Sequence, residues 1–109
     1  MTFNDYQDKS RETAIYPNAG NNIIYPTLGL VGEAGEIANK VKKIQRDSHG
    51  ILSESMRLAI LDEMGDAMWY MAQLATEIEV SFEEIAIQNI EKLQLRKQKG
   101  TIHGSGDTR

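Results

Sequence analysis

Two pairs of acidic residues, each pair three positions apart, have the types and spacing that metal chemistry needs. The pairs are Glu33 with Glu36 and Glu63 with Asp66. Side chains at this spacing point from one face of a helix, so two facing helices would bring four carboxylates together. A site of oxygen ligands without Cys or His favours a hard cation over zinc. We therefore expect a magnesium site in which Mn²⁺ can substitute.

A solvated helix flank is the alternative interpretation of any one of these acids. Glu36 precedes Lys40 by one helical turn, and such an exposed ion pair contributes a few tenths of a kcal/mol. Glu63 and Asp66 are harder to explain in this way, because they fall between two apolar faces of one helical segment. A carboxylate at the edge of a buried helix costs several kcal/mol unless a cation compensates it. Arg57 is the one basic residue near them in sequence, so a metal ion would remove that cost.

A row of polar and basic residues, Asn89, Lys92 and Arg96, follows at spacings of three and four. Such a row can hold phosphate oxygens, with Arg96 as a forked donor and Lys92 as a point charge. The alternative is a solvated basic flank, since cations near a helix C-terminus interact favourably with the helix dipole. Acids, a divalent cation and a basic row would alternate in charge around a polyphosphate, and we predict a site of that kind.

Aromatic residues near the acids are candidates for stacking on a base. Tyr70 follows Asp66 by one helical turn, and Trp69 directly precedes Tyr70. Trp69 also lies near the apolar face of its segment, where packing in the core is the commoner role. The remaining candidates are Tyr16 and Tyr25, which flank a loop, and Phe3.

Four helical segments and no strand must position these residues. We expect helices over about 3–15, 25–47, 54–79 and 82–100, followed by an irregular Gly-rich tail over 100–109. Thr2 with Asp5, and Ser81 with Glu84, have the spacing of capping boxes. The fold class is therefore all-α, with a single domain over 1–109.

The segment over about 54–79 has apolar residues on two nearly opposite faces. Leu58 and Leu61 belong to one face, and Ile60 and Ala67 belong to the other. A helix that is apolar on two sides is buried between neighbours. A chain this short provides too little cover for it, so we expect partner subunits to supply the rest.

The composition narrows the function classes. The chain has 109 residues, no cysteine and a net charge of −4. The lack of cysteine excludes disulfides, thiol nucleophiles, iron–sulfur clusters and cysteine-bound zinc. The negative charge argues against a nucleic-acid partner. With no apolar run of about 18 residues and no signal sequence, we expect a cytoplasmic protein with no membrane partner. Neither His49 nor His103 follows a Glu by three, which excludes a di-iron bundle.

Four stretches carry both acidic pairs, the aromatic pair, the basic row and the tail. They are GLVGEAGEIANKVKK (Gly29–Lys43), LDEMGDAMWYMA (Leu61–Ala72), NIEKLQLRKQKG (Asn89–Gly100) and GSGDTR (Gly104–Arg109). In these stretches the chain resembles the MazG-like nucleoside triphosphate pyrophosphohydrolases of the all-α pyrophosphatase superfamily. The resemblance implies Mg²⁺-dependent hydrolysis of (d)NTP to (d)NMP and pyrophosphate, with water attacking the α-phosphorus. It also implies a four-helix bundle assembled through subunit contacts, as a homodimer or a homotetramer (a dimer of dimers).

The resemblance also implies roles for individual residues. The family's E-x-x-E and E-x-x-D pattern is matched by the four proposed Mg²⁺ ligands, Glu33, Glu36, Glu63 and Asp66. Some members carry Glu immediately before the first of these ligands, where this chain has Gly32. Any of Glu33, Glu36 and Glu63 therefore stays a candidate for the general base.

The substrate contacts follow from a second motif. Asn89 and Lys92 match the family's N-x-x-K motif and would contact the phosphates with Arg96, while Tyr70 would lie at the substrate. Lys40 and Trp69 complete the candidate substrate contacts. Two functions of other classes stay open: a non-catalytic helical oligomerisation module with a structural cation site, and a regulatory module that binds nucleotide without hydrolysing it.

Overall fold

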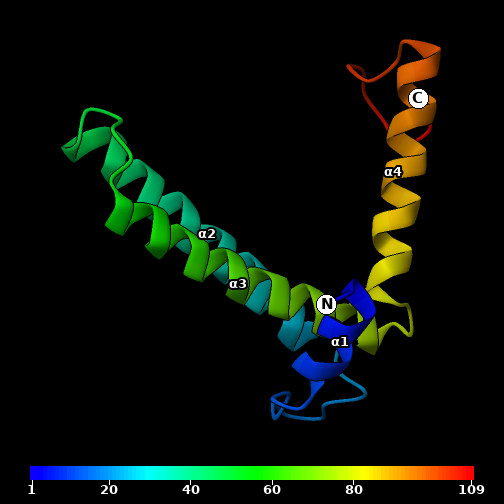
Figure 1. The fold of residues 1–109 in the computed structure, drawn as a ribbon. Coiled ribbons are helices and arrows are strands. Elements are labelled where there is room, and N and C mark those ends of the chain that lie inside the picture. Colours follow the sequence, from blue (N-terminus) through cyan, green and yellow to red (C-terminus); the bar gives the residue numbers. More distant parts are fainter.

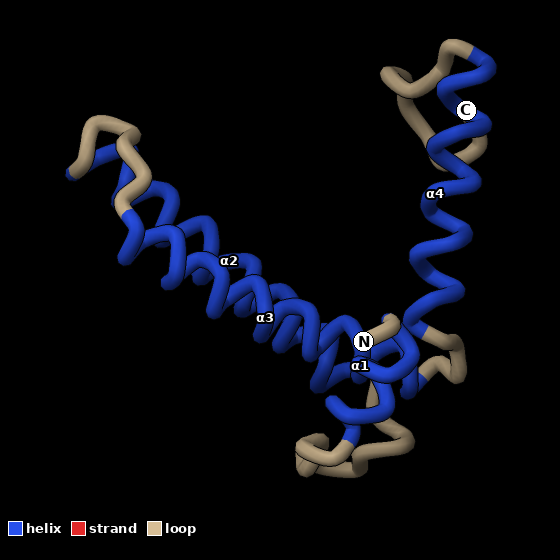
Figure 2. Tube along the Cα trace, viewed as in Figure 1, coloured by secondary structure: helices blue, strands red, loops and turns tan.

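The computed structural model describes residues 1–109 and contains four α-helices and no strand (Figures 1 and 2). The helices are α1 (Phe3–Arg11), α2 (Ile24–Asp47), α3 (Glu54–Glu77) and α4 (Phe82–Lys99). The prediction of an all-α fold is confirmed. None of the helices combines the length and the apolar character needed to cross a membrane.

The helix ends follow local capping chemistry. Thr2 and Asp5 form the predicted capping box, with a distance of 3.0 Å for each of the two bonds. Ser81 caps α4 by accepting from the Glu84 N–H at 3.0 Å, but the Glu84 carboxylate accepts from Gln88 instead of returning to Ser81. The second capping box is therefore only half formed. At the other end of α4, Gly100 adopts the left-handed φ of 70° that a glycine tolerates without strain.

The first helix is shorter than predicted, because α1 ends at Arg11 rather than near Ile15. The carbonyl of Ser10 accepts hydrogen bonds from the Thr13 hydroxyl at 2.9 Å and from the Trp69 indole at 3.2 Å. A side chain from α3 thus takes an acceptor that a longer helix would have used. The chain leaves the helix here and forms the loop that leads to α2.

The arrangement of the helices is open rather than bundled. In Figure 1, α2 and α3 run side by side as a long hairpin, α1 lies against the end of α3, and α4 extends away from the hairpin. Apolar side chains of α3 stay uncovered in this arrangement, with Leu61 61% and Met64 54% exposed. Burial of both apolar faces of α3 is therefore not reached within one chain.

The direction of α4 is fixed by side chains of α1. The Gln7 amide donates to the Thr76 hydroxyl and the Val80 carbonyl at 3.1 and 3.0 Å, and it accepts from the Phe82 N–H at 2.8 Å. Asn4 makes two further bonds to Glu83, both at 3.2 Å. These bonds hold the turn between α3 and α4, so α1 sets the angle at which α4 leaves the hairpin.

Candidate functional site

Three of the four predicted acids come together across the α2–α3 hairpin. Glu33 of α2 faces Glu63 and Asp66 of α3, and one carboxylate oxygen from each lies within 4.8 Å of the others. We call these three residues the acid cluster. Glu36, one turn further along α2, is exposed and lies outside the cluster.

A single lysine pairs with the acid cluster. The Nζ atom of Lys40 lies 3.1 Å from Oε1 of Glu63, so Lys40 bridges the hairpin instead of pairing with Glu36 on its own helix. The hydrogen bond from Lys40 lowers the pKa of Glu63. In contrast, burial and the neighbouring carboxylates of Glu63 and Asp66 raise the pKa of Glu33. Three carboxylates with one ammonium group leave an excess of negative charge, which fits a divalent cation.

Tyr70 lies over the backbone of α2 beside the acid cluster. A Cβ atom on Gly29 would overlap the Tyr70 ring, so the glycine is what lets the ring lie this close to α2. Burial raises the pKa of Tyr70, and the nearby Tyr25, Glu33 and Asp66 raise it further. Sequence reasoning did not single out Gly29 for this role, because the partner ring comes from another helix.

Three more aromatic rings continue from Tyr70. Tyr25 lies 6.4 Å from Tyr70 between ring centroids, and Tyr16 stacks on Tyr25 at 5.0 Å with an interplanar angle of 5°. Trp69 meets Tyr70 edge-on at 5.1 Å, while its indole N–H donates to the Ser10 carbonyl and, at 2.8 Å, to the Thr13 hydroxyl. Trp69 therefore ties α3 to the end of α1. We refer to Tyr16, Tyr25 and Tyr70 as the tyrosine row.

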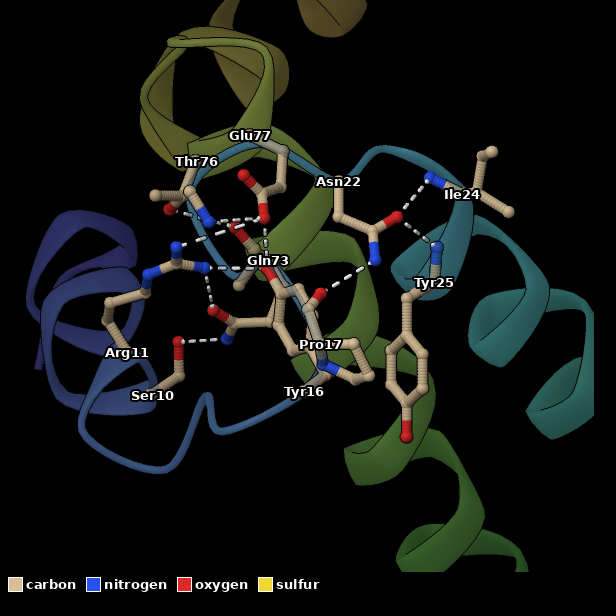
Figure 3. Close-up of polar contacts among 12 residues, drawn as sticks. Ser10, Arg11, Tyr16, Pro17, Asn22, Ile24, Tyr25, Gln73, Thr76 and Glu77 are labelled. Carbon is tan, nitrogen blue, oxygen red and sulfur yellow. Dashed lines mark hydrogen bonds and ion pairs between the residues drawn. The ribbon is translucent and has the colours of Figure 1, made fainter.

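A polar network that includes Tyr16 connects α1 to α3 (Figure 3). Gln73 is fully buried; its amide donates to the Ser10 hydroxyl at 2.8 Å and accepts from Arg11 at 3.3 Å. Arg11 also donates to the Tyr16 hydroxyl at 2.7 Å, and this hydroxyl donates to Glu77 at 2.6 Å. Sequence reasoning missed this network. The available signal was the presence of Gln73 and Glu77 among the apolar residues of α3.

The basic row of α4 does not lie beside the acid cluster within one chain. Asn89 and Lys92 are exposed and, with Ile85 and Gln88, line a hollow of about 420 Å³ on α4. This hollow lies on a helix that packs mainly against α1. The acids and the row therefore occupy separate parts of the protomer.

Arg96 differs from the other two members of the row. It is 6% exposed, and its Nη2 atom donates to the Asp107 carbonyl at 3.0 Å. The tail folds back over α4 and is closed by Arg109, which donates to the carbonyls of Thr101, Ile102 and Gly106. In this conformation Arg96 anchors the tail and its side chain is buried beneath it.

The chain is similar in sequence to a known protein family and to a phage protein. A model of the MazG nucleotide pyrophosphohydrolase domain matches residues 26–101, which include the acid cluster, Tyr70 and the α4 row. The Gene 37 protein of Mycobacterium phage L5 is 50% identical over 109 residues, covering 95% of this chain and 96% of that protein. No solved structure matches the chain. Tyr16 and Tyr25 precede the matched range.

Proposed function

The chain belongs to the family of the MazG nucleotide pyrophosphohydrolase domain, and we propose that it hydrolyses nucleoside triphosphates to nucleoside monophosphates and pyrophosphate. The observation that carries the proposal is the convergence of Glu33, Glu63 and Asp66, with Lys40 as their one basic partner. This convergence lies within the region that matches the family. We place the activity in the cytoplasm, where nucleoside triphosphates are made and used.

The acid cluster would hold Mg²⁺, with Glu36 joining from the next turn of α2. When bound, the ion would activate a water molecule and neutralise charge on the phosphates. The carboxylate donors and their excess negative charge suit this ion, and Mn²⁺ would substitute for it.

The reaction needs a base, a positioned triphosphate and a stabilised leaving group. A carboxylate accepts a proton from water as the water oxygen bonds to the α-phosphorus and the bond to the bridging oxygen of pyrophosphate breaks. Oε1 of Glu63 is already paired with Lys40, which favours Glu33 or Glu36 as this base. Lys40 lies at the edge of the cluster, where its ammonium can meet phosphate oxygens.

The nucleoside would lie against Tyr25 and Tyr70, since Tyr16, the third member of the tyrosine row, is only 7% exposed. Tyr70 is beside the acid cluster and Tyr25 follows it, so a triphosphate held at the acids would direct its nucleoside toward these rings. Stacking on aromatic rings suits any base, because every base has a flat apolar face. Trp69 supports Tyr70 from its edge.

A second copy of the chain would bring Asn89 and Lys92 to the acid cluster. Two observations support a homodimer or a dimer of dimers. The hairpin carries an apolar hollow of about 280 Å³, lined by Ile37 of α2, Met64, Ala67, Met68 and Met71 of α3, and Phe82 of α4. The α4 helix also leaves its own hairpin with apolar residues such as Ile90 and Leu95 about half exposed. Burial of such faces between copies is the usual way in which open protomers are stabilised.

The test is to incubate the protein with a panel of ribo- and deoxyribonucleoside triphosphates and Mg²⁺ and to resolve the products. We expect nucleoside monophosphate and pyrophosphate in equal amounts. Nucleoside diphosphate with orthophosphate would contradict the proposal. No turnover, with thermal stability independent of Mg²⁺, would instead support an oligomerisation module, and nucleotide binding without turnover would support a regulator.

A further inference from the structure

The carboxylate of Glu77 is buried outside the acid cluster and has no place in the proposed chemistry. Its side chain is 0% exposed, at the last residue of α3. Oε1 accepts from the Tyr16 hydroxyl at 2.6 Å and from the Gly20 N–H at 2.8 Å, while Oε2 has no partner. Burying a carboxylate is costly unless specific donors compensate it. The donors here come from the loop between α1 and α2.

The same loop determines where the tyrosine row lies. Tyr16 is held by Glu77 and Arg11, and its ring stacks on Tyr25. Further along, the Asn22 amide donates to the Pro17 carbonyl at 2.8 Å. Asn22 Oδ1 accepts from the Tyr25 N–H at 3.0 Å, at the start of α2 (Figure 3). Hydrogen bonds therefore hold the loop at both ends, from Glu77 at Tyr16 and Gly20 to Tyr25, whose ring lies next to Tyr70.

A role in stability alone explains this arrangement poorly. A buried ion pair or carboxylate is often no better for stability than an apolar residue of similar size. A carboxylate does, however, fix the direction of its donors, because each hydrogen bond is directional. Glu77 takes one donor from the Tyr16 side chain and one from the loop backbone, and so it fixes both the loop and the ring.

We propose that Glu77 is a positioning residue for the nucleoside end of the substrate. It locks the α1–α2 loop so that Tyr16, which is only 7% exposed, holds Tyr25 by stacking on it, and the exposed Tyr25 continues the aromatic surface that begins at Tyr70. Glu77 itself touches neither substrate nor metal. This inference rests on the proposed function, since it assigns the tyrosine row to the nucleoside.

The experiment compares Glu77→Leu with Glu77→Gln. The leucine removes both acceptors, and we expect KM for the best nucleotide of the panel to rise about tenfold with kcat little changed, because ground-state positioning is lost and the reacting groups stay in place. The glutamine retains one acceptor oxygen, so it should stay within about threefold of the wild-type KM. Mn²⁺ affinity should be unchanged in both variants.

A control substitution distinguishes an effect of Glu77 on substrate positioning from a general loss of stability. Ile44 is buried in α2, well away from the loop, and Ile44→Ala should lower the melting temperature while leaving KM unchanged. If Ile44→Ala raises KM as much as Glu77→Leu does, or if Glu77→Leu leaves KM unchanged, the positioning role is wrong.

Trp69 provides a readout that needs no turnover. It is the only tryptophan, it lies edge-on to Tyr16 at 6.4 Å, and it donates to Thr13 at the start of the loop. Glu77→Leu should shift its emission to the red and increase acrylamide quenching at temperatures where the helices remain folded. An unchanged emission would overturn the proposal.

Binding of a non-hydrolysable α,β-methylene triphosphate with Mg²⁺ completes the test. Weaker binding to Glu77→Leu supports the positioning role even if the wild type proves inactive, in which case only hydrolysis is contradicted. Equal binding to the wild type and Glu77→Leu overturns the positioning role and leaves the proposed hydrolysis standing.

Discussion

At the scale of single residues, the glycines near the acids have different structural roles. Gly32, Gly35 and Gly65 each directly precede one of the four acids, where a glycine allows either close helix packing or access for a ligand. Apart from the helix that carries each glycine, no atom lies within 4 Å of the position that a Cβ would take at any of these three, so packing within the protomer does not require them. Position 29, in contrast, must be a glycine in this packing, because the Tyr70 ring occupies the space that a Cβ atom would take.

Alanine substitution of these glycines should therefore give opposite results. Gly29→Ala forces the Tyr70 ring away and should lower the free energy of unfolding by about 1–3 kcal/mol. Gly32→Ala has open space and should raise it, by up to about 1 kcal/mol, because alanine favours the helix. Urea denaturation of the two variants checks this. Changes of the same sign would contradict the account of Tyr70.

The acid cluster gives a second residue-scale prediction. Asp66→Asn and Glu33→Gln should each remove the rise in melting temperature that Mn²⁺ produces in the wild type, because a cation stabilises only the state that binds it. Glu54→Gln, an exposed acid paired with Arg57 at the start of α3, serves as the control and should retain the rise. Differential scanning fluorimetry at several Mn²⁺ concentrations measures it. An undiminished rise in Asp66→Asn would exclude that residue as a ligand.

Glu77 gives a prediction about pH. Burial alone would raise its pKa, but hydrogen bonds from Tyr16 and Gly20 and the charge of Arg11 hold the pKa below the ordinary value of 4.5. A carboxyl group whose pKa is lower in the folded state stabilises the fold above the unfolded-state pKa, and this contribution is lost as pH falls through the folded-state pKa. The difference in unfolding free energy between wild type and Glu77→Gln should therefore be constant near neutral pH and shrink below about pH 4.5. A difference that grows in acid would contradict this sign.

At the scale of elements, the sequence predicts well what local chemistry decides. The four helices, the Thr2–Asp5 box and the Gly100 end all depend on residues a few positions apart. The same holds for the two acidic pairs, whose common helix faces follow from their spacing. What could not be predicted depends on partners from distant segments. Lys40 pairs with Glu63 on another helix, and α1 ends at Arg11 because Trp69 of α3 bonds to the Ser10 carbonyl. Neither contact follows from a local pattern.

The direction of α4 is the clearest case of a distant partner. Gln7 lies 75 positions before Phe82, and no periodic pattern in the sequence connects them. The burial of Arg96 could not be predicted for the same reason, since the Asp107 carbonyl that accepts from it belongs to the tail that folds back over α4.

Gln7→Ala should therefore destabilise the junction of α1, α3 and α4. It leaves the Phe82 N–H and the Val80 carbonyl without their partner, which should lower the free energy of unfolding by about 1–3 kcal/mol. Gln88→Ala, at an exposed position of α4, is the control and should stay within about 0.5 kcal/mol of wild type. Urea denaturation distinguishes them, and equal midpoints for Gln7→Ala and wild type would refute the role of Gln7.

At the scale of the whole molecule, the open shape separates the acids from the basic row. The protomer extends 44 × 42 × 27 Å and leaves apolar residues of α3 and α4 uncovered. Assembly would solve both problems if α4 of one copy covers the hairpin of another. This proposal predicts that a chain lacking an acid of the cluster and a chain lacking a residue of the basic row restore activity when they assemble together.

Mixing inactive variants tests this assembly directly. Asp66→Asn and Lys92→Ala, unfolded together and refolded, should regain activity, because a mixed dimer contains one site with both intact halves. Random pairing into dimers makes half of the molecules mixed, so recovery should approach about a quarter of the wild-type activity. Each variant refolded alone is the control. No recovery, with mixed dimers present by mass spectrometry, would contradict sharing of the site between copies.

In the proposed reaction water attacks the α-phosphorus of a nucleoside triphosphate, and hydrolysis in ¹⁸O-labelled water reports which phosphorus is attacked. The bond to the leaving pyrophosphate breaks on the side away from the new oxygen. We expect one ¹⁸O atom in the nucleoside monophosphate and none in the pyrophosphate, as resolved by mass spectrometry. Label in pyrophosphate, or in orthophosphate formed with a nucleoside diphosphate, would contradict it.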